Sequence, residues 1–305
     1  MFAAGSLFAI ALALFAQHLL GGRADAATAA GAVEPTAAKA GKGEPTAAAA
    51  GRGMRMVTRK FRMGRPNQKR RLTVRCPGNK WPMGGGVKTN PPLSAGGEGV
   101  YPHSYERLGV QGGFHTTPVL WDPTPRSTQR RTVKLQVMCG RKLGKVTPPH
   151  RTKWVKPGKT KTVIATCPGR RHLFGGGFQR TNFISRGGNF VTESHAISGK
   201  SWKVVAHAFG DFGGEITAIA YCVRSRRPLL REVSASTTIG HGQVGTARTP
   251  QCPGKRRLVY GGFSSSPSGS VFMGDGHFKR DGSWSTSAFN RFGPTANLTA
   301  YGYCL

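Results

Sequence analysis

Two stretches decide the fold: Ile-Thr-Ala-Ile-Ala-Tyr-Cys at residues 216–222 and Leu-Thr-Ala-Tyr-Gly-Tyr-Cys at residues 298–304. In both, every second residue is small or apolar, the period of two that predicts a strand with one buried face. The small residues on that face imply that another strand or sheet approaches closely. Trp202 and Trp284 each lie 20 residues before the final Cys of their stretch. Each stretch is therefore the end of a longer repeated unit.

The repeated unit occurs three times. Each copy opens with Cys-Pro-Gly, at residues 76–78, 167–169 and 252–254, and a Gly-rich triplet follows at residues 84–86, 175–177 and 260–262. A Trp and a closing Cys complete each copy, with Trp121 assigned to the first. No helix pattern follows the Gly triplets, so they predict bulged or tightly packed strands rather than a phosphate-binding loop.

The predicted fold class is all-β, with three internal repeats of four to five short antiparallel strands. Either the repeats close into a threefold β-prism-like arrangement, or they stand as separate units joined by linkers. One Cys at each end of each unit, with none elsewhere, favours one disulfide per repeat: Cys76–Cys139, Cys167–Cys222 and Cys252–Cys304. A zinc site lacks the Cys-x-x-Cys pair or Cys/His cluster that it needs.

The unit Cys-Pro-Gly…Gly-Gly-Gly-Phe…Trp…Ala-Tyr-x-Cys resembles a repeat of secreted, mostly uncharacterised proteins from Actinobacteria and related high-GC bacteria. The resemblance covers about residues 72–305. It implies an exported, disulfide-bonded β unit and no established activity. The first copy departs most, since its two Cys are further apart and a Pro/Gly-rich insert occupies residues 91–99.

The segments outside the repeats differ in composition. An apolar core at residues 7–16, followed by Ala24-Asp25-Ala26, predicts a signal peptide at residues 1–26, with an uncleaved membrane anchor as the alternative. The protein is accordingly expected to be secreted and associated with the cell surface. The remaining predicted segments are a disordered linker (27–52), a basic arm (53–71), the repeats (72–140, 162–223 and 247–305), a basic linker (141–161) and a second linker (224–246).

The charge predicts an anionic partner. The chain has 45 Lys+Arg against 12 Asp+Glu, a formal net charge of +33. Such a protein attracts polyanions by counterion release. We expect a non-enzymatic protein, without cofactor or metal, that adheres to cell-wall phosphates or to extracellular nucleic acid without reading base sequence. The predicted polyanion-binding residues are Arg59, Lys60, Arg62, Lys69, Arg70, Arg71, Arg141, Lys142, Lys153 and Lys156.

Two other function classes stay open at this point. A lectin-like module would stack glycans on Trp121, Trp202 and Trp284, although a Trp at a fixed place in a strand also fits core packing. A secreted hydrolase would use acid–His pairs spaced so that both side chains share one strand face, Glu193 with His195 and Asp275 with His277. The competing interpretation of these pairs is a surface charge pair copied with the repeat.

Overall fold

The computed structural model describes residues 53–64, 69–90, 92, 99–108, 113–121, 131–141, 143–181, 183–184, 187–225, 228–291 and 293–305. The chain divides after Pro45 into two compact units, and all described residues belong to the second, residues 46–305. The described residues form β-strands and contain no helix, which confirms the all-β class. The predicted signal peptide and the predicted linker at 27–52 lie outside them. Within the described residues there is no helix of the length and apolarity that a membrane crossing requires.

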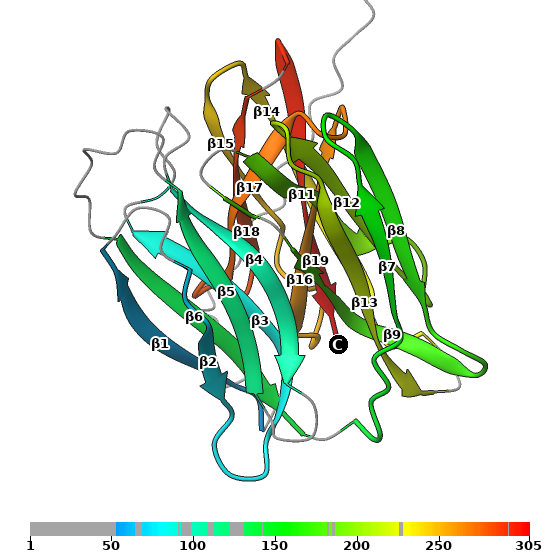
Figure 1. Ribbon diagram of the computed structural model, residues 1–305. Helices are drawn as coiled ribbons and strands as arrows, with labels where there is room; N and C mark the ends of the chain where they lie inside the picture. The colour runs from blue at the N-terminus through cyan, green and yellow to red at the C-terminus, as the bar shows by residue number, and fades with distance from the viewer. Residues whose placement is uncertain are drawn as a thin grey trace, which may run out of the picture. The chain divides into compact units, whose positions relative to one another are not determined.

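The strands form three antiparallel sheets (Figure 1). Sheet A has the order β1 (Arg55–Met63), β6 (Arg131–Gly140), β3 (Trp81–Asn90), β17 (Val271–Phe278), β18 (Trp284–Asn290) and β15 (Val244–Arg248). Sheet B has the order β2 (Leu72–Arg75), β5 (Gly113–Trp121), β4 (Gly99–Leu108), β9 (Arg171–Arg180), β13 (Gly214–Arg224) and β7 (His150–Val155). Sheet C has the order β14 (Arg231–Gly240), β19 (Thr295–Cys304), β16 (Leu258–Ser266), β11 (Gly187–Ala196), β12 (Ser201–Phe209) and β8 (Thr160–Thr166), and β10 (Phe183–Ile184) pairs with β11.

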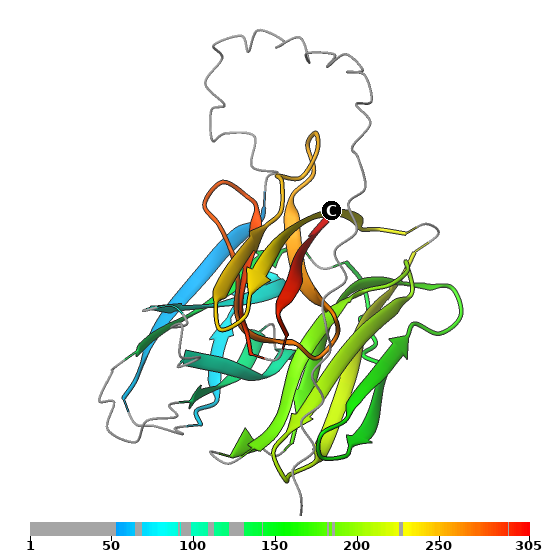
Figure 2. The same ribbon diagram turned by 90° about the horizontal axis from the view of Figure 1, so that it is seen from above.

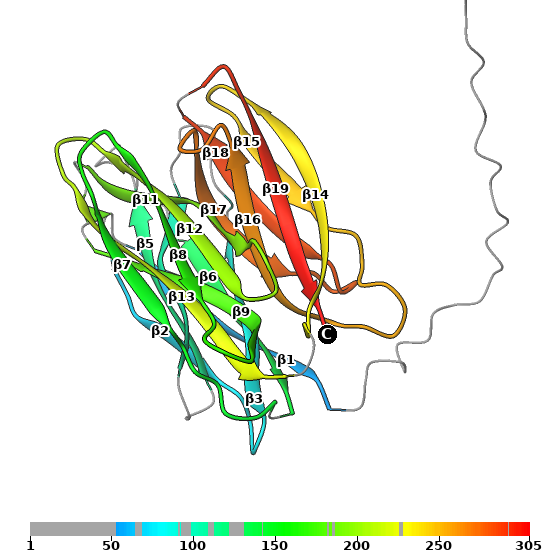
Figure 3. The ribbon, with the colours of Figure 1, turned by 90° about the vertical axis from the view of Figure 1, so that its right-hand side faces the viewer.

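Every sheet joins strands of two sequence units. When the strands of the preceding arm or linker are counted with each unit, the first unit supplies three strands to sheet A and three to sheet B. The second supplies three to sheet B and four, including the short β10, to sheet C, and the third supplies three to sheet C and three to sheet A. Figure 3 shows the third unit's share of sheet C, with β14, β19 and β16 side by side. The prediction of self-contained repeats of four to five strands is therefore wrong. A unit this small buries too little surface by itself, and sharing sheets lets neighbouring units cover its apolar faces.

The two halves of each sheet meet at a short junction. Val87 on β3 pairs with Gly276 on β17, Phe263 on β16 with Ser194 on β11, and Phe178 on β9 with Tyr105 on β4. We call residues of different sheets corresponding when they lie the same number of residues from the junction pair on equivalent strands, or pair with residues that do. This register lets each sheet be compared with the other two, position by position.

Segments predicted as arm and linkers form outer strands of the sheets. Strand β1 lies in the predicted arm, β7 in the predicted linker at 141–161, and β14 in the predicted linker at 224–246. On β1, Val57 and Phe61 pack against the core and Met63 is fully buried, while three of the four residues between them are charged. Charged side chains are typical of edge strands, because they discourage pairing with a further chain. A high density of charged residues therefore does not distinguish such an edge strand from an arm or a linker.

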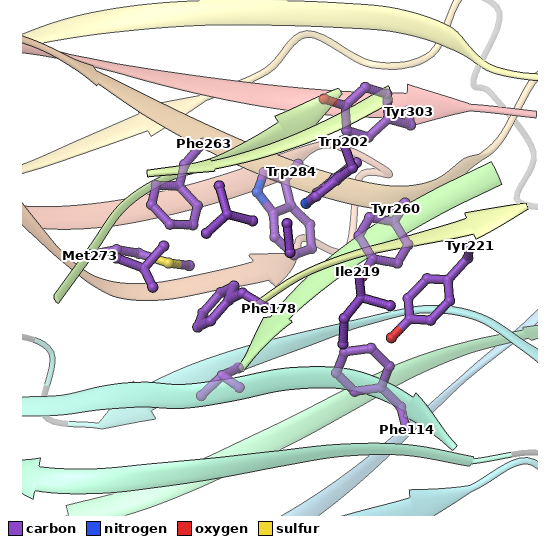
Figure 4. Packing of buried hydrophobic residues seen from close by; sticks show 14 of the residues in the cluster. Phe114, Phe178, Trp202, Ile219, Tyr221, Tyr260, Phe263, Met273, Trp284 and Tyr303 are labelled. Carbon is purple, nitrogen blue, oxygen red and sulfur yellow. The ribbon is translucent and has the colours of Figure 1, made fainter. Parts of the chain in front are cut away.

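The Gly triplets make room for three of the large buried rings that Figure 4 labels, Phe114, Trp202 and Trp284. A Cβ at Gly176 would lie 2.0 Å from a ring carbon of Trp202, and one at Gly261 would lie 2.0 Å from a ring carbon of Trp284. The first unit places Phe114 over Gly85 in the same way, so Phe114, not Trp121, is the counterpart of the two Trp residues. The ladders also contain bulges next to the triplets, as between Pro82 and Gly84. The predicted role of the triplets in packing is confirmed.

The three predicted disulfides are present, joining Cys76 to Cys139, Cys167 to Cys222 and Cys252 to Cys304, with Cα–Cα distances of 5.6, 5.6 and 5.7 Å. Each bond ties the opening of a unit to the unit's last strand. The closing Cys residues are fully buried. No free cysteine remains among the described residues.

Candidate anion-binding groove

The ten predicted polyanion-binding residues do not form one patch. Lys60 and Arg62 share one face of β1 and Arg59 lies on the other, because side chains alternate along a strand. The Arg70 guanidinium lies over the Phe61 ring at 5.9 Å and donates to the Arg62 carbonyl at 3.4 Å. These contacts hold Arg70 against β1 rather than in a free arm.

The other predicted residues lie elsewhere. Lys69 and Arg71 line a hollow of about 340 Å³ over sheet B that also contains Glu106 and Glu215, so it is of mixed charge. Burial, and secondarily the charge of Arg180, lowers the pKa of Lys69. Lys153 and Lys156 are exposed on and just after β7, and Arg141 is exposed after β6. Lys142 lies outside the described residues.

A larger groove, of about 720 Å³, lies over sheet A. It is lined by residues of five strands and of the turn after β17, and only Lys60 belongs to the predicted set. Its cationic lining residues are Lys60, Lys88, Lys134, Arg248, Lys279 and Arg280. Asp281 is the one acidic lining residue in the described part of the chain; it forms an ion pair with Arg248 and accepts hydrogen bonds from the backbone and hydroxyl of Ser283.

Three of these lysines stand in one row across three adjacent strands. Lys60 on β1 pairs with Lys134 on β6, and Lys134 pairs in turn with Lys88 on β3. Directly opposed residues have Cβ atoms about 5 Å apart, and like charges there are destabilising. None of the three forms an ion pair with a described residue. The row thus concentrates positive charge without a protein counter-charge.

The corresponding rows of the other sheets are neutral. In sheet C the row is Ser236, Thr299 and Ser264, and the Ser236 and Thr299 hydroxyls lie 2.7 Å apart. In sheet B it is Thr152, Thr217 and Gln179, with 2.8 Å between the Thr152 and Thr217 hydroxyls. The fold is therefore compatible with hydrogen-bonded hydroxyl rows at this place. Of the three corresponding rows, only that of sheet A consists of lysines.

Gln136 and Gly86 shape the floor of the groove. The Gln136 side chain accepts from the Phe278 backbone N–H at 2.9 Å and donates to the Phe278 carbonyl at 3.2 Å. Gly86 leaves the space for this contact, since the Cβ of any larger residue at this position would lie 2.9 Å from the His277 Cα. The side chain thereby joins β6 to β17 across β3.

The predicted pair Asp275 and His277 lies at this groove. The His277 Nδ1 is 3.8 Å from the Asp275 Oδ1, too far for a hydrogen bond. Both residues are buried, and His277 lines the groove. His277 pairs across the sheet with Ser285, which pairs with Arg248.

The predicted pair Glu193 and His195 has a different environment in sheet C. Glu193 binds the Lys203 ammonium at 2.5 Å, accepts from the Ser268 hydroxyl at 2.6 Å and lies 3.4 Å from the His195 Nε2. The Tyr301 ring stacks on His195 with 4.6 Å between ring centroids. Burial alone raises the pKa of Glu193, but hydrogen bonds from these three groups and the Lys203 charge bring it down to about 2.

The first unit contains an acid–His pair that sequence reasoning missed. The His115 Nε2 lies 3.1 Å from the Glu106 Oε1, and both residues are buried. The two residues oppose each other on β5 and β4 rather than following one another on one strand. Only the strand register could have found them. Glu106 corresponds to His195 and His277, so the three pairs are built differently.

These pairs do not form a nucleophile–base relay. Ser268 and His195 both bind the same carboxylate, so the imidazole does not stand between acid and hydroxyl as catalysis by serine requires. The Ser194 hydroxyl accepts the indole N–H of Trp202 at 3.0 Å. In sheet C the arrangement is an ion-pair network that joins β11, β12 and the turn after β16. No group of three or more metal-ligating side chains occurs among the described residues.

The depressed pKa of Glu193 predicts a loss of stability in acid. Its folded-state pKa of about 2 lies below the ordinary 4.5, so the carboxylate contributes stability above pH 4.5 that is lost as pH falls toward 2. Urea unfolding at pH 7 and pH 3 should show the wild type losing on the order of 2 kcal/mol more than Glu193→Gln over this interval. Equal losses in both proteins would show that this network is not responsible.

Lys88 and Lys134 are functional candidates that composition could not single out. Comparison of the three units gives the signal. The first unit has Lys134-Leu135 where the second has Thr217-Ala218 and the third has Thr299-Ala300, so a lysine replaces a threonine only in the first. No protein-family model matches the chain, and no curated protein is detectably similar to it.

Proposed function

We propose that the protein binds a phosphate-bearing anionic polymer in the groove over sheet A. The observation that carries this proposal is the row Lys60, Lys134 and Lys88, which opposes like charges on neighbouring strands without a protein counter-charge. Such an arrangement costs stability unless an anion neutralises it. Lysine ammonium groups and flanking guanidinium groups are phosphate-binding groups.

We further infer that the three units are related by an approximate threefold axis. Tyr101, Phe190 and Phe272 occupy corresponding positions, and their rings contact one another with centroid distances of 5.9, 6.5 and 4.0 Å. Equivalent residues of three units meet in this way only near a shared axis. In Figure 2 the strands of the three units can be told apart by colour: blue to cyan for the first, green for the second and yellow to red for the third. On this inference, sheets B and C serve as internal references for sheet A.

The ligand is expected to be held through its charges rather than through base edges. The groove offers several flexible cations, and the described part of the chain contains no helix that could enter a nucleic-acid groove, so we expect sequence-independent binding. Cell-wall phosphate polymers and extracellular nucleic acid share the phosphodiester that this chemistry recognises. Export from the cell is supported by the signal-peptide pattern and by the three disulfides, which persist in oxidising compartments.

The two alternative functions lose some of the residues on which they relied. Trp202 and Trp284 are each 1% exposed and cannot offer a ring to a sugar. Glu193 and His195 are occupied by the ion-pair network of sheet C. Glycan binding would then rely on Trp121, whose side chain lies outside what the structure describes, and hydrolysis would rely on Asp275 and His277.

A salt titration tests the proposal. We expect the purified, disulfide-bonded chain to bind long-chain inorganic polyphosphate, with the logarithm of the association constant falling linearly with the logarithm of salt concentration. Five or so cationic contacts predict a slope of roughly −3 to −4. Binding that persists unchanged in about 1 M salt, where charges are screened within ~3 Å, would contradict it.

A further inference from the structure

We infer that His277 contacts the bound phosphate and makes binding in the groove pH-dependent. The inference rests on the proposed function and names a residue and a regulation of the same site. His277 is 5% exposed and lines the groove, and neither ring nitrogen has a hydrogen-bond partner among the residues that the structure describes. A buried polar atom without a partner costs free energy. A phosphate oxygen that reaches the groove floor supplies the missing acceptor.

The corresponding histidine shows that this exposure to a ligand is specific to sheet A. His195 in sheet C is covered by the Tyr301 ring, its Nδ1 lies 2.9 Å from the Ala196 carbonyl, and Glu193 lies beside it. In sheet A, Gln136 takes the place of Tyr301 and bonds to the backbone of Phe278 instead of covering the imidazole. The ring of His277 is therefore not covered by an aromatic ring as His195 is, and its buried, unpartnered nitrogens lie in the wall of the groove.

The charges around His277 set the direction of the pH effect. Ser285, opposite it on β18, is neutral, and Asp275 on the same strand is 3.8 Å away. The charged groups that line the same groove on the neighbouring elements are Lys60, Lys88, Lys134, Arg248, Lys279, Arg280 and Asp281. A protonated imidazole adds a positive charge at the floor and a second N–H donor, so an anion binds it more tightly. Binding should therefore strengthen as the pH falls from 8 to 5.5.

The test is polyphosphate binding to the full chain at pH 8 and pH 5.5, since the internal groups of this polymer stay ionised throughout. The wild type should bind roughly tenfold more tightly at pH 5.5. His277→Gln, which keeps an N–H donor but cannot gain a proton, should lose most of this increase. His195→Gln is the matched control in sheet C and should keep the wild-type increase.

A second variant covers the case in which His277→Gln does not fold. Asp275→Asn removes a negative charge that lies 3.8 Å from the imidazole of His277, so its gain in affinity between pH 8 and pH 5.5 should be smaller than that of the wild type. A wild-type curve in both variants, or the same loss in His195→Gln as in His277→Gln, would overturn the role of His277.

The lysine row separates this inference from the proposed function. Lys60→Ser, Lys88→Ser and Lys134→Thr combined should weaken binding at both pH values. If that triple variant binds as the wild type does, the proposed function itself fails. If it binds weakly while His277→Gln keeps the full pH response, the groove is the site and only the role of His277 is wrong.

Discussion

Replacing Lys60, Lys88 and Lys134 together by Ser, Ser and Thr is expected to weaken polyphosphate binding on the order of a hundredfold at about 0.1 M salt. Each lysine is thereby replaced by the residue type found at the corresponding position of sheet C, where the row consists of Ser236, Ser264 and Thr299. Removing three phosphate contacts should also make the salt dependence shallower by roughly 2. The fold should be at least as stable as before, because the opposed like charges are gone.

The matched control removes the same net charge away from the groove. Lys153, Lys156 and Lys161 are exposed on and around β7 and β8, and none lines the groove. Their combined substitution by Ser should leave affinity within a fewfold of the wild type. If both triple variants lose affinity equally, net charge rather than the lysine row is responsible for binding. Isothermal titration at several salt concentrations gives the affinity and the salt slope together.

Replacing Trp284 by Ala is expected to destabilise the protein by about 3–5 kcal/mol. Trp284 is 1% exposed, covers Gly261, and meets the Phe278 ring edge-on with 5.1 Å between centroids. Truncation leaves a cavity over a glycine, which has no side chain to fill it. The surrounding strands cannot close the space without breaking the ladders on either side.

Trp284→Phe is the matched control, because the first unit uses Phe114 at the corresponding position over Gly85. A ring over the glycine is then retained, and the loss should be less than half that of the Ala variant. Urea unfolding followed by far-UV circular dichroism measures both. Similar, small losses in the two variants would mean that the contact between ring and glycine is not the basis of the core.

The sequence predicted those parts of the fold that depend on local spacing. Matched Cys, Gly and Trp positions predicted the repeat, the all-β class and the disulfide pairing. The Gly triplets signalled packing because apolar residues flank them and no helix follows. The all-β class and the disulfide pairing are confirmed, since each depends on residues within one unit.

The division of each unit between two sheets could not be predicted from such spacing. The junctions consist of only one or two paired residues, as at Val87 and Gly276, and they join segments far apart in the sequence. On β1 the alternation of core-facing and exposed residues is obscured by the many charged side chains, so the sequence predicts an arm where the structure has an edge strand. Sequence alone also does not show which strands are neighbours, and so it could not reveal that Lys60, Lys88 and Lys134 stand in one row.

The same limit applies to the acid–His pairs. Glu193 with His195 and Asp275 with His277 were found because each pair lies on one strand. Their different environments depend on Tyr301 and Gln136, which come from the neighbouring strands β19 and β6. The pair Glu106 and His115 was missed because it crosses between strands.

Lysine footprinting tests the central claim, that the groove over sheet A is where an anionic polymer binds. The chain would be acetylated with and without long-chain polyphosphate, and the modification of each lysine measured by mass spectrometry. We predict that polyphosphate protects Lys60, Lys88 and Lys134, while Lys153, Lys156 and Lys161 stay reactive. Uniform protection of all six lysines, or protection that spares the row, would contradict the account.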